Sequence, residues 1–440
     1  MFAPYLRKMH TFILSMKTNT HTSTTSNSQP MKTIQSCTSA PLRRKSVRIL
    51  AGSIAALLAL TAPSAFADTI SSSADVRFSS SNPNSNDAGN LALYNNGGDN
   101  MQRTFLNFNL GSYSGNSVTT DATLTLSAQT FGGGYNFLTG VGLGTANSAW
   151  TQAGITWNNQ PGLTTIAGAT NPGGSFNTGD NVTWTIPWYM LEKMATTGSG
   201  YNNGLGITSG AGSTLHFQAT GGGGPSPTLT FSAATAASST WTGGNGNWTD
   251  TSNWAGSTVT EGIGQAATIN GGTAVNITMN ANRSVGSLSF SGANHTISSG
   301  SGKLALNVIS GAPTISVETG RTATIGATVV GIDGLTKNGN GTLTFTAANT
   351  YTGATTISGG TLQLGAGSTA DNLSTSSAIV NNGNLTINRS NAVTQGTDFS
   401  SAAITGTGSF TQAGPAPPPS PRTTPTPARR TSPAAPSVSL

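Results

Sequence analysis

Ionisable side chains are scarce in this chain of 440 residues, of which only 7% are Asp, Glu, Lys or Arg. After residue 67 there are two histidines, His216 and His295, and each stands alone among polar residues. The acids are also spaced singly, as in Asp250, Glu261, Glu318, Asp333, Asp371 and Asp398. Glycosidases usually need two facing carboxylates, and metal sites need clustered ligands. We therefore expect no catalytic residues, no metal and no cofactor, although residues distant in the sequence can converge in a fold.

Aromatic side chains offer a different chemistry, which is the binding of sugars. Aromatic faces stack on sugar rings in sites where a few polar groups fix the orientation. Trp184, Trp188 and Tyr189 lie together in "NVTWTIPWYM" and are candidate ligand-binding residues. The alternative is that the rings fill a core, because aromatic side chains bury large areas. We expect the core position for Trp150 and Trp157 in particular.

Arg103 is the fourth candidate for ligand binding. It precedes the apolar run "TFLNFNL", where a cation is unusual. A guanidinium there either meets a ligand or forms a buried structural ion pair, for which Asp75 is the expected partner.

The composition indicates an all-β protein. Short runs of Val, Ile, Leu, Thr and Phe alternate with Gly, Asn and Asp, and 57 residues are Gly. Such runs are typical of strands and tight turns, whereas helices favour Lys, Glu and Gln. Apolar residues make up 35% of the chain and recur periodically, which argues against disorder.

The net charge of the whole chain is +6, but residues 68–414, here called the body, are acidic. Lys and Arg number 8 before residue 68, 8 in residues 68–414 and 3 in the tail, while all 13 acids lie in 68–414. That body therefore carries 8 − 13 = −5. Nucleic-acid binding usually needs a basic surface, so we expect no nucleic-acid partner.

Residues 1–67 have the pattern of a leader with a signal peptide. Basic residues at 43–48 precede the apolar run "ILAGSIAALLALTA", and small residues at Ala65 and Ala67 mark the expected cleavage site. The true start could be Met31. A bilayer span needs about 20 apolar residues, so we favour cleavage before Asp68 over an uncleaved anchor, with membrane contact only during export. The single cysteine, Cys37, lies in this leader, so no disulfide is expected.

Residues 68–232 predict a first β domain. In "TFLNFNL", Phe105 faces one side and Leu106, Phe108 and Leu110 the other, and in "DATLTLSAQ" Ala122, Leu124 and Leu126 share a face. Further short strands separated by turn residues favour a jelly-roll-like sandwich. "QRTFLNFNL", "ATLTL", "GITWNNQPG" and the closing "PTLTF" resemble a DNRLRE-type domain. That resemblance implies an extracellular sandwich related to carbohydrate-binding modules.

After a linker at 233–240, residues 241–414 predict a solenoid. Short strands that end in Gly or Asn recur at close spacing, which is typical of a parallel β-helix. "GLTKNGNGTLTFTAANTYTG" and "TTISGGTLQLG" closely resemble the autotransporter-associated β-strand repeat. The resemblance implies a right-handed β-helix in a secreted or surface-exposed passenger.

The tail, residues 415–440, differs from everything before it. "PAPPPSPRTTPTPARRTSPAAPSVSL" is rich in Pro, Arg and Ala and predicts disorder. Its degenerate codons can be read in another frame as a further copy of the repeat, so one hypothesis is a base lost near Gly414. The alternative is a genuine Pro-rich linker.

Together these features predict a non-enzymatic bacterial protein, secreted or on the cell surface. Its partner would be a polysaccharide, bound by the sandwich, with the β-helix as a passenger-type stalk. The alternative is a polysaccharide lyase or hydrolase with its site on the β-helix.

Overall fold

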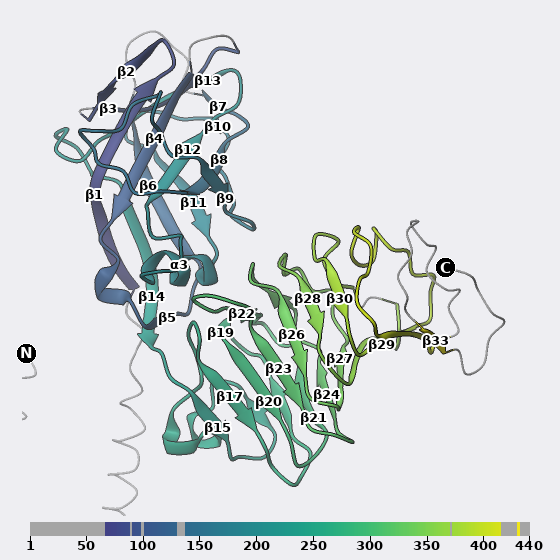
Figure 1. The fold of residues 1–440 in the computed structure, drawn as a ribbon. Helices are drawn as coiled ribbons and strands as arrows, with labels where there is room; N and C mark the ends of the chain where they lie inside the picture. The colour runs from purple at the N-terminus through teal and green to yellow at the C-terminus, as the bar shows by residue number, and fades with distance from the viewer. Residues whose placement is uncertain are drawn as a thin grey trace, which may run out of the picture. The chain divides into compact units, whose positions relative to one another are not determined.

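The structure is a computed structural model, and it describes residues 67–88, 90–97, 101–129, 137–369, 372–414 and 429–431. The predictions for residues 1–66 of the leader, including the cleavage-site residue Ala65, and for most of the tail lie outside these ranges. Ala67, after which cleavage is predicted, is the first residue of β1 (Ala67–Ser79). The described residues confirm the all-β class, with an antiparallel N-terminal part and a parallel solenoid (Figure 1). None of the helices in the described ranges is long and apolar enough to cross a membrane.

The first part, here called the sandwich, is entirely antiparallel. Backbone pairing runs in a closed ring from β1 through β14, β6, β13, β3 and β4, because β4 also pairs with β1. Ring closure leaves fewer free strand edges, which are liabilities for aggregation. Its strands are β1 (Ala67–Ser79), β2 (Asn82–Asp87), β3 (Asn90–Asn95), β4 (Met101–Phe108), β5 (Asn116–Val118), β6 (Ala122–Gln129), β7 (Phe137–Leu138), β8 (Gly142–Ala146), β9 (Leu163–Thr165), β10 (Gly174–Ser175), β11 (Asn181–Ile186), β12 (Leu205–Thr208), β13 (Ser213–Gln218) and β14 (Thr228–Thr235).

Strand β4 has two buried faces, as its alternation predicts. Leu106 and Phe108 join the main apolar core of the sandwich. Phe105 points to the opposite side, where it packs with Val76 and Phe78 in a smaller cluster. The segment that covers this smaller cluster, residues 147–162 between β8 and β9, carries most of the candidate site described below.

One α-helix interrupts the strands where the sequence analysis expected none. In "NVTWTIPWYM", β11 ends at Ile186, and α3 (Trp188–Ala195) begins directly after Pro187. Pro has no N–H to donate and a φ angle suited to a helix start. The free N–H of Trp188 donates to the Asp121 carboxylate at 3.1 Å. All eight residues of α3 are buried.

The second part is a parallel β-solenoid of about six turns over residues 266–412. Its strands form sheets of seven, nine and three members, in which every pairing is parallel. The strands are β15 (Ser239–Trp241), β16 (Gly246–Asn247), β17 (Ala266–Ile269), β18 (Asn276–Thr278), β19 (Arg283–Val285), β20 (Ser287–Phe290), β21 (His295–Ser298), β22 (Leu304–Leu306), β23 (Thr314–Val317), β24 (Thr322–Ile325), β25 (Val329–Val330), β26 (Leu335–Asn338), β27 (Thr342–Phe345), β28 (Thr355–Ile357), β29 (Thr361–Ser368), β30 (Ile379–Asn381), β31 (Asn384–Arg389), β32 (Ser409–Gln412) and β33 (Arg429–Thr431).

Inward side chains stack from coil to coil along the solenoid. One such column contains Ile297, Ile325, Phe345, Leu364 and Ile387, all fully or almost fully buried. In the tail, for which the sequence predicts disorder, β33 pairs with β32.

Candidate functional site

The aromatic residues predicted to bind a ligand lie inside the protein. Trp184 has no exposed surface, Trp188 is 3% exposed and Tyr189 is 8% exposed. Trp184 packs edge-on against Phe217, and Trp188 and Tyr189 lie on α3 in the same core. A buried ring presents no face to a sugar, so the stacking surface has to be sought among other aromatic residues.

Arg103 does not form the expected ion pair with Asp75. The Asp75 carboxylate is buried and accepts hydrogen bonds from the Ser72 hydroxyl at 2.9 Å and from the backbone N–H of Thr220 at 2.9 Å. Arg103 instead donates from Nη1 to Gln160 Oε1 at 2.9 Å. The two residues diverge because Asp75 pairs with Leu106, whereas Arg103 lies opposite Phe78 on the same strand pair.

The Arg103 guanidinium lies over the Trp157 ring. Its central carbon is 4.9 Å from the ring centroid, a cation–π distance. Partial burial lowers the pKa of Arg103 from its ordinary value, but an arginine retains its charge in proteins. Arg103 is therefore a fixed cation at a half-buried position of β4.

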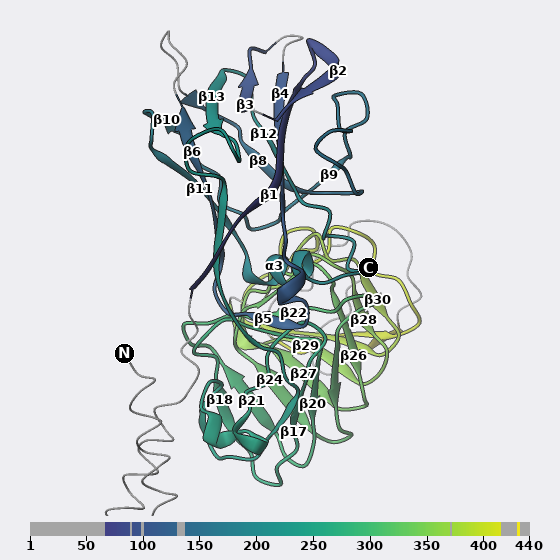
Figure 2. The ribbon, with the colours of Figure 1, turned by 90° about the vertical axis from the view of Figure 1, so that its left-hand side faces the viewer.

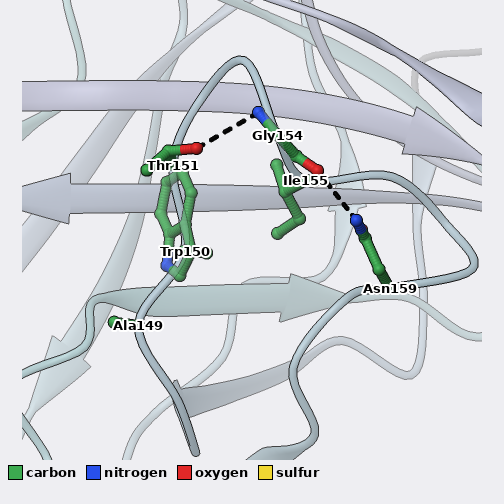
Figure 3. Close-up of a pocket in the computed structure, with 6 residues that line it drawn as sticks. All are labelled: Ala149, Trp150, Thr151, Gly154, Ile155 and Asn159. Atoms are coloured by element: carbon green, nitrogen blue, oxygen red, sulfur yellow. Dashed lines mark hydrogen bonds between the residues drawn. The ribbon is translucent and has the colours of Figure 1, made fainter.

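A pocket of about 310 Å³ opens beside Trp150 (Figure 3). It is lined by Ala149, Trp150, Thr151, Gly154, Ile155 and Asn159. Trp150 is half-buried, with its ring perpendicular to that of Phe105 and its Nε1 donating to the Asn203 carbonyl at 2.8 Å. An indole fixed in this way beside amide and hydroxyl groups has the chemistry of a sugar-binding pocket.

A second pocket, of about 290 Å³, contains Arg103. Its other lining residues are Gly142, Leu143, Gly144, Leu163, Thr165 and Thr208. Added side chains would not fit at Gly144, where a Cβ would lie 2.9 Å from the Thr164 carbonyl oxygen. This pocket offers one cation and two hydroxyls to a ligand.

The segment that carries Trp150 and Trp157 is held by its own amides. Asn159 accepts from the Thr156 N–H at 2.5 Å. It also donates to the Gly154 carbonyl at 2.8 Å, as Figure 3 shows. From β2, Asn86 donates to the carbonyls of Gln152 at 2.8 Å and Ile155 at 2.6 Å. These bonds fix the loop before any ligand arrives, which lowers the entropic cost of binding.

Sequence reasoning did not name Trp150 or Asn159, which line the first pocket, among its candidate binding residues. It assigned Trp150 and Trp157 to the core, whereas both are only partly buried. The available signal was their position in "AWTQAGITWNNQPG", where Gly and Asn predict a loop on the surface rather than a central strand.

Most of the isolated acidic residues form ion pairs with Lys or Arg. Asp333, Glu261, Glu318 and Asp398 form ion pairs with Lys193, Arg283, Arg321 and Arg389 respectively. His216 lies in the sandwich and His295 in the solenoid. Within the described ranges, no group of three or more His, Cys, Asp or Glu could hold a metal ion.

Comparisons with known families fit this division of the chain. Residues 67–233 match carbohydrate-binding module family 96, which corresponds to the sandwich. Residues 335–364 match the passenger-associated-transport-repeat, which runs from β26 to the first half of β29 in the solenoid. Both matches confirm the resemblances found in the sequence. No curated protein matches the chain.

Proposed function

We propose that this chain is an exported, non-enzymatic surface or extracellular protein whose sandwich binds a polysaccharide. The observation that carries the proposal is the pair of pockets around Trp150 and Arg103, on a sandwich that matches a carbohydrate-binding module family. Trp150 supplies an aromatic face, Asn159 an amide, and Arg103 a charged donor. The solenoid with its passenger repeat acts as the stalk that presents the sandwich.

Retention on immobilised polysaccharides tests the binding. Trp150→Ala removes the stacking face, and Arg103→Gln removes the charge while keeping a side-chain N–H donor. We expect each variant to bind about tenfold more weakly than the unmodified chain, which corresponds to about 1.4 kcal/mol. Dissociation constants are measured by depletion from solution against a panel of neutral and acidic polysaccharides.

The matched control is Phe137→Ala, since Phe137 is an exposed aromatic residue, 42% accessible, that lines neither pocket. It should bind like the unmodified chain. Circular dichroism establishes that each variant is folded. Unchanged affinity in both folded pocket variants would refute the site.

The same incubations test whether the chain is an enzyme. Reducing ends and unsaturated products are measured over time beside the binding assay. We expect neither to form. Product formed in proportion to protein concentration would favour the lyase or hydrolase alternative.

A further inference from the structure

Helix α3 joins the sandwich to the solenoid through buried contacts. Trp188 Nε1 donates to the Ser284 hydroxyl at 3.1 Å, and Asn307 Nδ2 donates to the Tyr189 carbonyl at 3.0 Å. Lys193 Nζ lies 2.7 Å from Asp333 Oδ1 in an ion pair whose lysine is 2% exposed. Trp188, Tyr189 and Lys193 belong to α3, and their partners belong to the solenoid.

Apolar packing continues across the same contact. Ala305 of β22 and Val330 of β25 belong to the apolar core of the sandwich, and both are buried. The helix lies beside β5 of the sandwich (Figure 2). The junction is therefore a buried interface between the sandwich and the solenoid as well as a covalent linker.

A carboxyl group lies at the centre of this interface. Glu192 of α3 has no exposed surface. Its Oε1 accepts from the Val118 N–H at 3.0 Å and from the Ser117 hydroxyl at 3.3 Å, both on β5. Its Oε2 accepts from Asn307 Nδ2 at 2.8 Å, across the junction. Most ionised side chains at such depth have a dedicated partner of opposite charge.

Most charged groups near Glu192 bind partners other than Glu192. Arg283 of β19 interacts electrostatically with Glu192 but pairs directly with Glu261 at 2.9 Å. On α3 itself, Lys193 pairs with Asp333. From the sandwich, Asp121 faces the helix start and accepts from its backbone.

Within the described ranges no ion pair joins Glu192 to a cation, and the nearby Arg283 pairs with Glu261. If both glutamates were ionised beside Arg283, one negative charge would remain in a buried site. Burial raises the pKa of Glu192 to about 7, against hydrogen bonds that lower it. Burial also raises the pKa of Glu261, which Arg283 counteracts.

We propose that the junction is a pH-sensitive contact, which is docked when the Glu192 carboxyl is protonated and loosens when that carboxyl ionises. In the loosened form Glu192 meets water and regains an ordinary acidity. Ionisation then favours the loosened form because water solvates the carboxylate better than the buried interface does. The pH of the surroundings would thereby set how rigidly the solenoid holds the sandwich.

Linkage gives the direction and size of the effect. The docked form holds the proton up to about pH 7, whereas the loosened form releases it near pH 4.5, the ordinary value. Docking is therefore strongest below pH 4.5 and weakens as the pH rises to 7. Between pH 5.5 and 7.5 the docking equilibrium should weaken ~20-fold.

Hydrogen exchange of the full chain measures this opening. Peptides that contain the Val118 amide and α3 report the junction, with rates corrected for the intrinsic effect of pH. We expect the opening constant to rise about twentyfold from pH 5.5 to 7.5. Glu192→Gln, which keeps a neutral acceptor, should abolish that rise. The matched control is Glu318→Gln, at a half-exposed solenoid position, which should behave like the unmodified chain.

The proposal fails if the junction shows no pH dependence, or if Glu192→Gln keeps it in full. Should that variant not fold, carbon-13 spectra of the unmodified chain decide the matter. The sequence contains only three glutamates, at 192, 261 and 318, so selective labelling gives three carboxyl signals. One signal must titrate near pH 7 and remain in Glu261→Gln and Glu318→Gln chains. The absence of such a signal overturns the proposal.

Discussion

Lys337 occupies a position where the adjacent coils carry isoleucine. Ile315 precedes it and Ile357 follows it in the same inward column. The lysine is fully buried, and its ammonium group donates to the carbonyls of Asn338 at 2.7 Å and Gly339 at 2.9 Å. A third bond, of 3.2 Å, reaches Gly359 in the next coil. Lys337 thus ties two turns of the repeat together.

The first prediction concerns the pH dependence of this lysine. Burial lowers the pKa of Lys337 from 10.5 to about 8, so the unfolded chain binds more protons than the folded chain between these values. Its contribution to the free energy of unfolding must rise with pH in that window. Relative to Lys337→Met, the unmodified chain should gain about 2 kcal/mol between pH 7 and 9.5. Urea denaturation at both pH values measures the difference.

Lys303→Met is the matched control, because Lys303 is exposed on the same solenoid. Its effect should be the same at both pH values. The measurements stay below pH 10 because tyrosines of the unfolded chain ionise there, while burial raises the pKa of Tyr351 in the folded chain. A Lys337→Met effect that does not change with pH would contradict the prediction.

At the scale of elements, glycines permit close approach between successive coils. Gly334 has a φ of +79°, and a Cβ at this position would lie 2.1 Å from the carbonyl oxygen of Ala354. The positive φ disfavours any residue with a side chain, and the short distance to the next coil leaves no space for a Cβ. Glycine at this turn, directly before β26, therefore allows successive coils to stack closely.

The second prediction separates these two requirements. Gly311 has the same φ of +79° but no atom within 4 Å of the position of an added Cβ. Gly311→Ala should lower the free energy of unfolding by about 1 kcal/mol, the cost of the backbone conformation alone. Gly334→Ala should cost at least about 2 kcal/mol more, because the coils must move apart. Equal losses in urea denaturation would show that the contact carries no penalty.

At the scale of the whole molecule, three tryptophans close the first coils of the solenoid. Trp241, Trp248 and Trp254 are at most 2% exposed. Trp254 packs edge-on against both others, with ring centroids 5.1 and 5.0 Å away. Trp248 also donates to the Thr260 carbonyl at 2.9 Å. Solenoids need such caps because each coil otherwise buries its apolar face only against a neighbour.

The third prediction tests this cap. Trp248→Ala should lower the free energy of unfolding by about 3–5 kcal/mol, since a large buried ring is lost. Trp248→Phe keeps a ring but loses the bond to Thr260, so its loss should be smaller. Circular dichroism during urea denaturation gives both values. A stability of Trp248→Ala within error of the unmodified chain would mean that the coils need no cap at this end.

Local pattern was enough to predict the all-β class of this protein and the faces of individual strands. The alternation in "TFLNFNL" and "DATLTLSAQ" predicted which side chains share a face, because neighbouring residues of a strand always point to opposite sides. The repeat "GLTKNGNGTLTF" predicted parallel coils, because its short strands and glycine turns recur within the spacing of one turn. The helix α3 was missed, since a strand and a helix meet there at a single proline.

Only the tertiary structure decided which side chains could form a site. Alternation assigns a residue to a face but does not say what covers that face, so Trp184 became core while Trp150 lines a pocket. Arg103 donates a hydrogen bond to Gln160, 57 positions away, and forms no ion pair with Asp75. The burial of Glu192 depends on Asn307, 115 positions away. Burial and pairing of this kind arise from contacts between distant segments, which no local pattern contains.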